Sequence, residues 1–143
     1  MSSVEKFYQG SNVRAFRLDR RGVLARLRGR ARTLVDSDPT VLEVRLFGSI
    51  ARGGSHPGSD ADLFIVVRDG VPGPLQRIPN LARAFTGVGV GCDVVAYTES
   101  EYAALAARGG AFSRAVIDEG MVLARRGERN PEEPGSNGEV SPR

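Results

Sequence analysis

Two aspartates stand at the start of the most apolar stretch of the chain, and this arrangement constrains the fold more than any other feature. Residues 61–67 read Ala-Asp-Leu-Phe-Ile-Val-Val, an almost unbroken apolar run that is typical of a buried strand. Asp60 and Asp62 are two residues apart, so both side chains point to the same side of such a strand. Aspartate is a poor strand residue, and burying two of them requires a chemical reason.

The surrounding sequence alternates between helical and extended patterns. Residues 13–35 place apolar side chains mostly at helical spacing, and Asp36-Ser-Asp-Pro39 ends this helix. A strand is expected at 41–47, with its alternation assigning Leu42, Val44 and Leu46 to one face and Val41, Glu43, Arg45 and Phe47 to the other.

The second half of the chain continues the alternation. Residues 75–85 have helical spacing that Pro79 delays or kinks, and a strand is expected at 92–97. Thr98 and Glu101 have capping-box spacing at the start of a helix that runs to about residue 108. A further helix at 112–119 and a short strand at 121–124 follow. Helices interleaved with three or four strands predict an α/β (α+β) domain with one mixed sheet.

Length and composition are those of one globular domain. At 143 residues with 41% apolar side chains, the chain can form a single core, which we place in residues 1–126. Residues 127–143 are polar and rich in Pro, Gly and Glu, so we expect a disordered tail there. The apolar runs are too short to span a membrane, no secretory signal is visible, and the single cysteine, Cys92, favours a cytoplasmic location.

A Gly-Ser turn precedes the aspartate pair by a fixed spacer. Gly48 and Ser49 follow the first expected strand, and residues 50–59 separate them from Asp60. Gly48 lets the backbone approach a phosphate, Ser49 can donate a hydrogen bond, and Arg52 lies on what we expect to be a first helical turn at 50–53. These groups together form a candidate phosphate-binding loop.

A third aspartate completes the candidate site. Asp93 begins the strand expected beside residues 61–67, where it could bind metal and accept a proton from an attacking hydroxyl. His56 is the only histidine, so a zinc cluster is excluded and an oxygen-liking metal, Mg²⁺ or Mn²⁺, is expected. A phosphate loop beside three carboxylates is what phosphoryl or nucleotidyl transfer requires.

Each of these residues also has a purely structural interpretation. Gly48-Ser49 is an ordinary turn, Asp60 and Asp62 could be a solvated strand start, and Asp93 could be an edge residue. Cys92 is better explained as a small buried hydrophobic residue than as a nucleophile, and His56, in a Gly/Pro/Ser loop, is given no role. The complete pattern favours function over these alternatives.

Residues 14–32 form a strongly basic segment. They contain eight arginines against Asp19 alone, a local charge of +7, while the remainder of the chain sums to −4. Such a helix could bind nucleic acid or an acidic partner. It could equally be a solvated face in a chain that prefers arginine, since Lys6 is the only lysine. The charge pattern alone does not decide between these interpretations.

At these residues the chain resembles the minimal nucleotidyltransferases of the DNA-polymerase-β-like superfamily. The matching segments are Phe47-Gly-Ser-Ile-Ala-Arg-Gly53, Ser59-Asp-Ala-Asp-Leu63, Asp93 on a later strand, and Ile117-Asp-Glu-Gly-Met-Val-Leu123. The resemblance spans about residues 10–125 and implies a polymerase-β-like palm fold. The ten-residue spacer is its specific part.

The resemblance also implies a mechanism and a partner. Asp60 and Asp62 would bind two Mg²⁺ ions, and Asp93 would bind one and help deprotonate the acceptor. Gly48, Ser49, Ser59 and Arg52 would hold the incoming nucleotide, ATP. The chain looks most like the MntA-type antitoxins, which are thought to silence a HEPN-domain ribonuclease toxin by transferring AMP to it. The alternatives are a binding module that neutralises a partner without catalysis, and nucleotidyl transfer to RNA or a small molecule.

Overall fold

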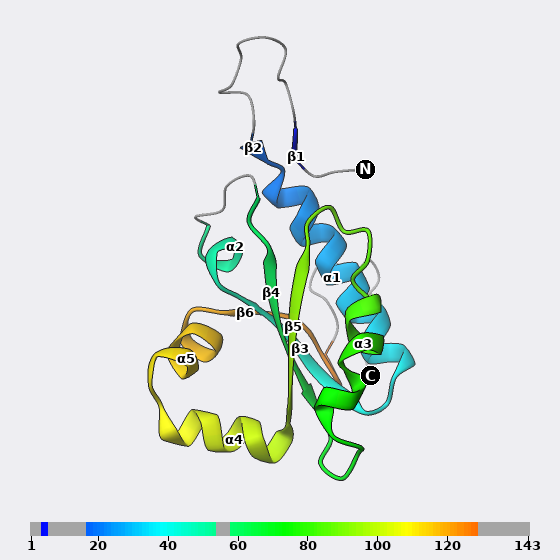
Figure 1. Ribbon diagram of the computed structural model, residues 1–143, viewed down its shortest axis with the longest axis vertical. Coiled ribbons are helices and arrows are strands. Elements are labelled where there is room, and N and C mark those ends of the chain that lie inside the picture. The colour runs from blue at the N-terminus through cyan, green and yellow to red at the C-terminus, as the bar shows by residue number, and fades with distance from the viewer. Residues whose placement is uncertain (1–3, 6–16, 54–57, 129–143) are drawn as a thin grey trace, which may run out of the picture.

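The computed structural model describes residues 4–5, 17–53 and 58–128. A four-stranded mixed sheet runs through the molecule in the order β5-β4-β3-β6 (Figure 1). Strand β3 is antiparallel to both β4 and β6, whereas β5 is parallel to β4. The sheet strands are β3 (Val41–Phe47), β4 (Ala61–Val67), β5 (Cys92–Thr98) and β6 (Met121–Arg125).

Helices cover both faces of this sheet. The first face carries α1 (Arg20–Ser37) and α3 (Pro74–Arg83); the second carries α4 (Glu99–Arg108), α5 (Ala111–Ser113) and the π-helical turn η2 (Arg114–Asp118). A single-turn helix, α2 (Ser49–Arg52), follows β3, and β1 (Val4–Glu5) pairs with β2 (Arg17–Leu18) before α1. The expected α/β class with one mixed sheet is confirmed. Within the described ranges, none of the helices combines the length and apolar character needed to cross a membrane.

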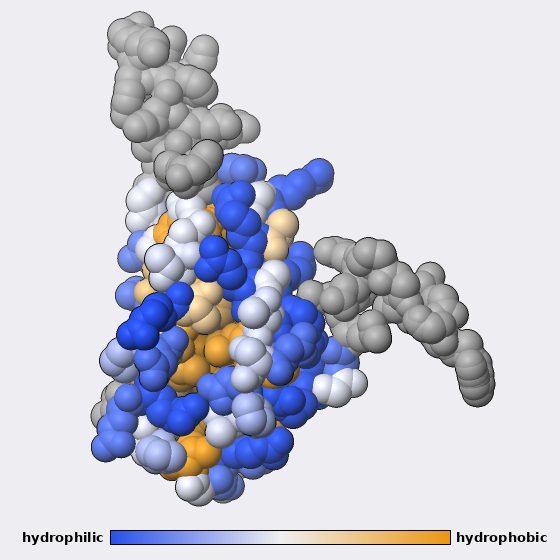
Figure 2. Space-filling model, turned by 90° about the vertical axis from the view of Figure 1, so that its right-hand side faces the viewer, coloured by the Kyte–Doolittle hydropathy of each residue, from blue (hydrophilic) through white to orange (hydrophobic). Residues whose placement is uncertain are grey.

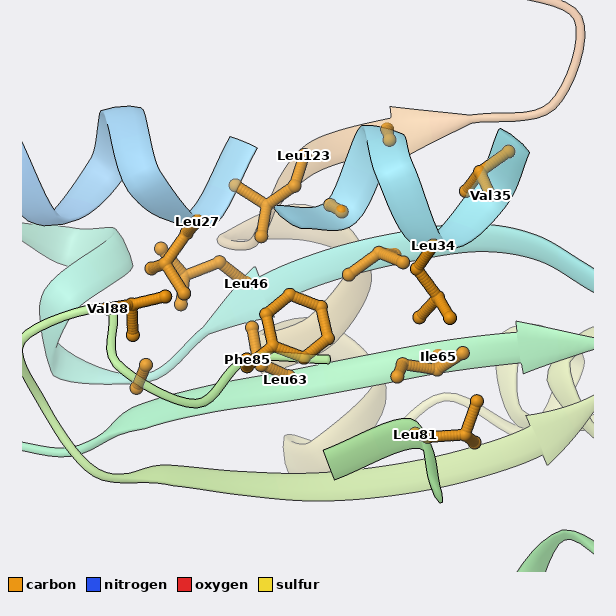
Figure 3. Close-up of a cluster of buried hydrophobic side chains, with 14 of the residues drawn as sticks. Leu27, Leu34, Val35, Leu46, Leu63, Ile65, Leu81, Phe85, Val88 and Leu123 are labelled. Carbon is orange, nitrogen blue, oxygen red and sulfur yellow. The ribbon is translucent and has the colours of Figure 1, made fainter. Parts of the chain in front are cut away.

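The larger core lies between the sheet and the α1–α3 layer. Figure 3 shows Leu27 and Leu34 of α1 above Leu46 and Ile65 of the sheet, with Phe85 from the segment after α3 between them. All these side chains are at most 8% exposed. Each fully buried side chain of this size contributes roughly 1.5–3 kcal/mol to folding, so this layer fixes the position of α1 over the sheet.

The first helix begins later than its apolar pattern suggested. Arg17–Leu18 form strand β2, and α1 begins at Arg20 after the N-cap Asp19, whose carboxylate accepts a hydrogen bond from the Gly22 amide. A Cβ at position 22 would lie 2.3 Å from that carboxylate, so the glycine permits the cap. The expectation of a helix from residue 13 is therefore wrong over residues 17–18, and residues 13–16 lie outside the described part of the chain.

Strand β3 departs from simple alternation. Its register against β4 shifts between Val41 and Glu43, so Val41 faces the α1 side together with Val44 and Leu46, whereas Leu42 packs on the other face. The extra residue of this bulge reverses the expected assignment at Val41 and Leu42. Glu43, Arg45 and Phe47 lie where the alternation placed them, on the α4 side.

The remaining elements follow the sequence expectations closely. Thr98 and Glu101 form the capping box of α4, with the Glu101 amide donating to Thr98 Oγ1 over 3.2 Å and the Thr98 amide to Glu101 Oε1 over 3.0 Å. Pro79 lies inside α3, which begins at Pro74. The expected helix at 112–119 is split into α5 and η2. Of the expected tail, residues 127–128 are described and exposed, and the remainder lies outside the described ranges.

Candidate active site

The strand register brings two of the three aspartates side by side. Asp62 of β4 pairs directly with Asp93 of the parallel strand β5. Directly paired residues on neighbouring strands point to the same face and lie about 5 Å apart. Both face the α4 side, because their neighbours Leu63 and Val94 belong to the core beneath α1. Asp60 precedes β4 by one residue at the same end of the sheet.

The half-buried Asp62 is the aspartate of this group whose carboxyl pKa is raised. Burial raises the pKa of its carboxyl, the charge of Asp93 and then that of Asp60 raise it further, and the positive charge of Arg52 lowers it in part. Asp60 and Asp93 are exposed. Three carboxylates that repel one another at one sheet end form a donor set that a divalent cation would stabilise.

The side chains nevertheless do not converge on a single point. Within the described ranges, no three Asp, Glu, His or Cys side chains are grouped closely enough to hold a metal ion together. The backbone register already places Asp62 beside Asp93, and the exposed side chains of Asp60 and Asp93 can rotate without any movement of the strands. The metal-binding roles of Asp60, Asp62 and Asp93 stay predictions.

The turn after β3 packs directly against Asp62. Gly48 has φ 82° and ψ −159°, a conformation that is essentially confined to glycine. A Cβ at this position would lie 2.1 Å from Asp62 Oδ2. The glycine therefore lets the backbone of the turn touch the carboxylate. Gly48-Ser49 and the Asp-x-Asp pair, ten residues apart in sequence, are in direct contact through this residue.

The single helical turn α2 carries Ser49 and Arg52 beside this contact. The Arg52 amide donates to the Gly48 carbonyl over 3.1 Å, and Gly53 ends the turn in a left-handed conformation. The half-exposed guanidinium of Arg52 lies 3.9 Å from the carboxylate of Glu119, which follows η2. Arg52 thus stands between two acidic groups, Asp62 and Glu119, and is accessible to an incoming anion.

A second close backbone approach positions Asp60. The Ala61 amide donates to the Gly91 carbonyl over 2.9 Å, and a Cβ at Gly91 would lie 2.9 Å from Asp60 Oδ1. Ser59 immediately precedes this aspartate and is buried, at 8% exposure. The end of the loop before β5 therefore lies directly against Asp60.

Cys92 precedes Asp93 but faces the core beneath α1, and its thiol is poorly suited to act as a nucleophile. Burial, followed by the charges of Asp60 and Asp93, raises the pKa of the Cys92 thiol to about 11. The thiol is therefore protonated near neutral pH, and its sulfur lies 3.8 Å from the Val90 carbonyl and 3.9 Å from the Phe85 carbonyl. This agrees with the interpretation of Cys92 as a small apolar residue. His56 lies outside the described residues.

Two residues of the site were not identified from the sequence. Glu119 reaches Arg52 only because η2 and β6 return the chain to the α2 end of the sheet. A Cβ at Gly120 would lie 2.3 Å from the Val116 carbonyl, so this glycine permits the tight return after η2. Gly91 is one of three glycines in the segment Gly87-Val-Gly-Val-Gly91. Nothing in the sequence distinguishes it from the other two, and only the structure shows that it packs against Asp60.

Comparison with known proteins gives one family match and several similar solved structures. The family model described as a nucleotidyltransferase domain matches residues 24–106, which include Gly48, both aspartates of the pair and Asp93. No curated protein matches the sequence significantly. Among solved structures, an inferred nucleotidyltransferase from Sulfolobus solfataricus is 21% identical with a TM-score of 0.55, over 75% of this chain and 84% of that one. A toxin–antitoxin structure with AMP-PNP is 19% identical with a TM-score of 0.48, over 71% and 73%.

Proposed function

The chain belongs to the nucleotidyltransferase domain family, and from this premise we propose that it is a Mg²⁺-dependent enzyme that transfers AMP from ATP to a hydroxyl group of a protein. The contact of Gly48 with Asp62, beside the register pair of Asp62 and Asp93, is the observation that carries this proposal. This contact supports the proposal because a glycine turn of this kind suits a phosphate and the neighbouring carboxylates suit a metal ion. The family match supports the reaction type, and the sequence resemblance to MntA-type antitoxins supports AMP and a HEPN-type toxin as the acceptor.

The carboxylate group fits a divalent cation by its chemistry. Asp60, Asp62 and Asp93 supply only oxygen ligands. Burial first, and then the charges of Asp93 and Asp60, raise the pKa of Asp62, and a bound cation would offset the repulsion between these carboxylates. Bound Mg²⁺ would polarise the phosphate oxygens and neutralise charge that develops on them. Mn²⁺ has the same ligand preference and is expected to substitute.

The remaining groups orient the reactants. Ser49 and the exposed guanidinium of Arg52 would hold the terminal phosphates of ATP. The exposed Asp93 would accept the proton of the acceptor hydroxyl, while the oxygen of that hydroxyl forms a bond to the α-phosphorus. The bond from the α-phosphorus to the bridging oxygen breaks, and pyrophosphate leaves. AMP remains on the acceptor.

The test uses the protein encoded by the adjacent gene as the candidate toxin. The purified protein is incubated with it in the presence of Mg²⁺ and ATP, and modification of the candidate toxin is measured. Intact-mass spectrometry should show addition of whole AMP units by the wild type. Asp62→Asn should show none while retaining the fold, because the amide keeps the shape and removes charge repulsion. Asp36→Asn is the matched control, since Asp36 is exposed on α1 and, among the described residues, pairs only with Arg32.

The outcomes separate the proposed function from its alternatives. Absence of any adduct with wild-type protein and all four nucleotides would contradict the proposal. If Asp62→Asn still neutralises the toxin in cells, binding alone is sufficient and the chain is a non-catalytic partner. An adduct on RNA or on a small molecule, with the protein unmodified, would retain the reaction and replace the acceptor.

A further inference from the structure

The arginines of α1 are distributed along the whole helix, and several of them bind backbone rather than face solvent. Figure 2 views the α1 and α3 side of the molecule, where hydrophilic residues surround a strip of apolar ones. Four arginines on α1 donate hydrogen bonds to main-chain carbonyls far away in the sequence: Arg20, Arg26, Arg30 and Arg32. Arg21 and Arg28 have no hydrogen bond or ion pair among the described residues.

Arg20 binds the single-turn helix α2. Its Nε donates to the Ile50 carbonyl over 2.9 Å, and its Nη2 lies 3.4 Å from the Ala51 carbonyl. Both carbonyls belong to the turn that carries Ser49 and Arg52. A helix of one turn has too few internal hydrogen bonds to be stable alone. Its position therefore depends on outside contacts such as this one and the buried Ile50 side chain.

Arg26 and Arg30 bind the segment that leads into β5. Arg26 Nε donates to the Val88 carbonyl over 2.8 Å, while Arg30 Nη1 donates to the Ala84 carbonyl over 3.1 Å and to the Thr86 carbonyl over 2.6 Å. Residues 84–91 contain no helix or strand, and Figure 3 shows Val88 beneath α1 close to Leu27. This segment ends at Gly91, which packs against Asp60, and Asp93 follows two residues later.

We propose that Arg20, Arg26 and Arg30 are positioning residues that make α1 a brace between the two halves of the active site. Arg20 holds the phosphate half, α2, and Arg26 and Arg30 hold the loop that sets Asp60 and Asp93. The inference rests on the proposed function and assigns a role to the basic helix that the charge pattern left open. A guanidinium that donates its N–H groups to backbone carbonyls stabilises the fold, and those N–H groups are not available to bind the phosphates of a nucleic acid.

The choice of arginine over lysine follows from geometry. The planar guanidinium presents several N–H donors in a fixed fork, so one side chain can reach two carbonyls from different nitrogens, as Arg20 does with Nε and Nη2. Arg30 reaches its two carbonyls from Nη1 alone, and the rigid guanidinium plane fixes the direction of that nitrogen. Lysine has the same charge but a single compact ammonium group. Substitution by lysine therefore weakens the brace while leaving the net charge unchanged, which separates positioning from long-range electrostatics.

The experiment compares Arg20→Lys, Arg26→Lys and Arg30→Lys with Arg21→Lys and Arg28→Lys on the same helix. Hydrogen–deuterium exchange of the full chain is measured without substrate, so its result does not depend on catalysis. Arg20→Lys should accelerate exchange in residues 48–53, and Arg26→Lys and Arg30→Lys should accelerate it in 84–91, each by about tenfold, the effect of one lost hydrogen bond to a charged group. The two control variants should exchange like the wild type.

Kinetics then distinguishes local positioning from general destabilisation. Arg20→Lys should raise KM for ATP by about three- to tenfold with kcat nearly unchanged, because α2 holds the nucleotide. Arg26→Lys and Arg30→Lys should lower kcat by about tenfold with KM for ATP nearly unchanged, because they displace Asp60 and Asp93. A merely structural role would lower the active fraction equally in all three.

Wild-type exchange in both segments for the three brace variants would overturn the inference, whatever the activity. If the wild type transfers no nucleotide, yet the three brace variants accelerate exchange as described, the proposed function is refuted and the positioning role stands. If Arg20→Lys, Arg26→Lys and Arg30→Lys change nothing, while Arg21→Glu and Arg28→Glu abolish a salt-dependent affinity for tRNA, the helix is a nucleic-acid surface and the inference is wrong.

Discussion

Replacement of Gly48 by alanine tests the central contact of the site most directly. The new Cβ would lie 2.1 Å from Asp62 Oδ2 and 3.1 Å from Asp62 Cγ, well inside any normal contact. The carboxylate must therefore rotate away from its place beside Asp93, or the turn must move. Both changes disrupt the arrangement that we propose for catalysis, so the variant should lose AMP transfer.

The stability cost has two separable parts. A non-glycine residue at φ 82° and ψ −159° costs about 1–3 kcal/mol in backbone strain. The steric overlap with Asp62 adds about 1–3 kcal/mol, the usual cost of overpacking a site that can partly relax. Gly109 provides the matched control, because it has φ 72° and ψ −158° and nothing lies within 4 Å of its Cβ position. Gly109→Ala should therefore cost only the backbone strain.

A double-mutant cycle isolates the overlap. Urea denaturation followed by far-ultraviolet circular dichroism gives the free energy of unfolding of Gly48→Ala, Asp62→Ala and the double variant. Asp62→Ala removes the oxygen that the new Cβ would meet, so Gly48→Ala should cost no more in that background than Gly109→Ala costs in the wild type. Equal costs for Gly48→Ala and Gly109→Ala in the wild type, or an excess that survives Asp62→Ala, would refute the contact.

Three further predictions follow from other contacts. Burial raises the pKa of Asp38, but hydrogen bonds from Thr40 and the charge of Arg77 lower it more, so the net shift is downward from 3.8. The ionised form is thus favoured by folding, and Asp38→Asn should be less stable than the wild type above pH 3.8, with the difference in unfolding free energy vanishing as the pH falls through the folded-state pKa. Arg45→Met removes a buried ion pair with Glu43 (2.7 Å) and hydrogen bonds to the carbonyls of Val116 and Ile117. Urea denaturation should show that the free energy of unfolding falls by about 3 kcal/mol. This is the lower end of the range for breaking a buried ion pair, because Arg125 still faces Glu43. Glu119→Gln releases Arg52 from an exposed ion pair and should change the free energy of unfolding by less than about 1 kcal/mol. Steady-state assays should show a KM for ATP lowered by up to about fivefold, because Arg52 is then available to the nucleotide phosphates. A raised KM would show that Glu119 orients Arg52 rather than competing with the phosphates for it.

The fold could be predicted largely because local signals agreed with one another. The apolar run at 61–67 is β4 to the residue, the capping box at Thr98 and Glu101 begins α4, and the turn after Gly48 is helical. In each case the deciding information lies within a few residues of sequence. The sequence also predicted that the strand begun by Asp93 lies beside residues 61–67, and the structure confirms this neighbour relation. The parallel direction that pairs Asp93 with Asp62 came only from the structure.

Features that depend on distant segments could not be predicted in this way. The bulge that turns Val41 and Leu42 is a property of the pairing between β3 and β4 and has no signal in the apolar pattern. The arginines of α1 looked like one charged stripe, yet four of them donate to carbonyls 30 to 96 residues away. Carbonyls are present at every residue, so no sequence pattern identifies which of them an arginine will bind.

The strand directions make two sequence spacings respond differently to insertion. The end of β3 and the starts of β4 and β5 lie at the same end of the sheet, where Phe47 pairs with Asp62 and Asp62 with Asp93. Between Asp62 and Asp93 the chain travels to the far end and returns through α3. Extra residues in the turn at 69–73 would lengthen the sequence between the second and third acids without moving either. The connection from Gly48 to Asp62, by contrast, joins two residues that are in direct contact, so a change in its length acts on this contact without an intervening helix to absorb it. We therefore expect the shorter spacing to tolerate insertion less well than the longer one.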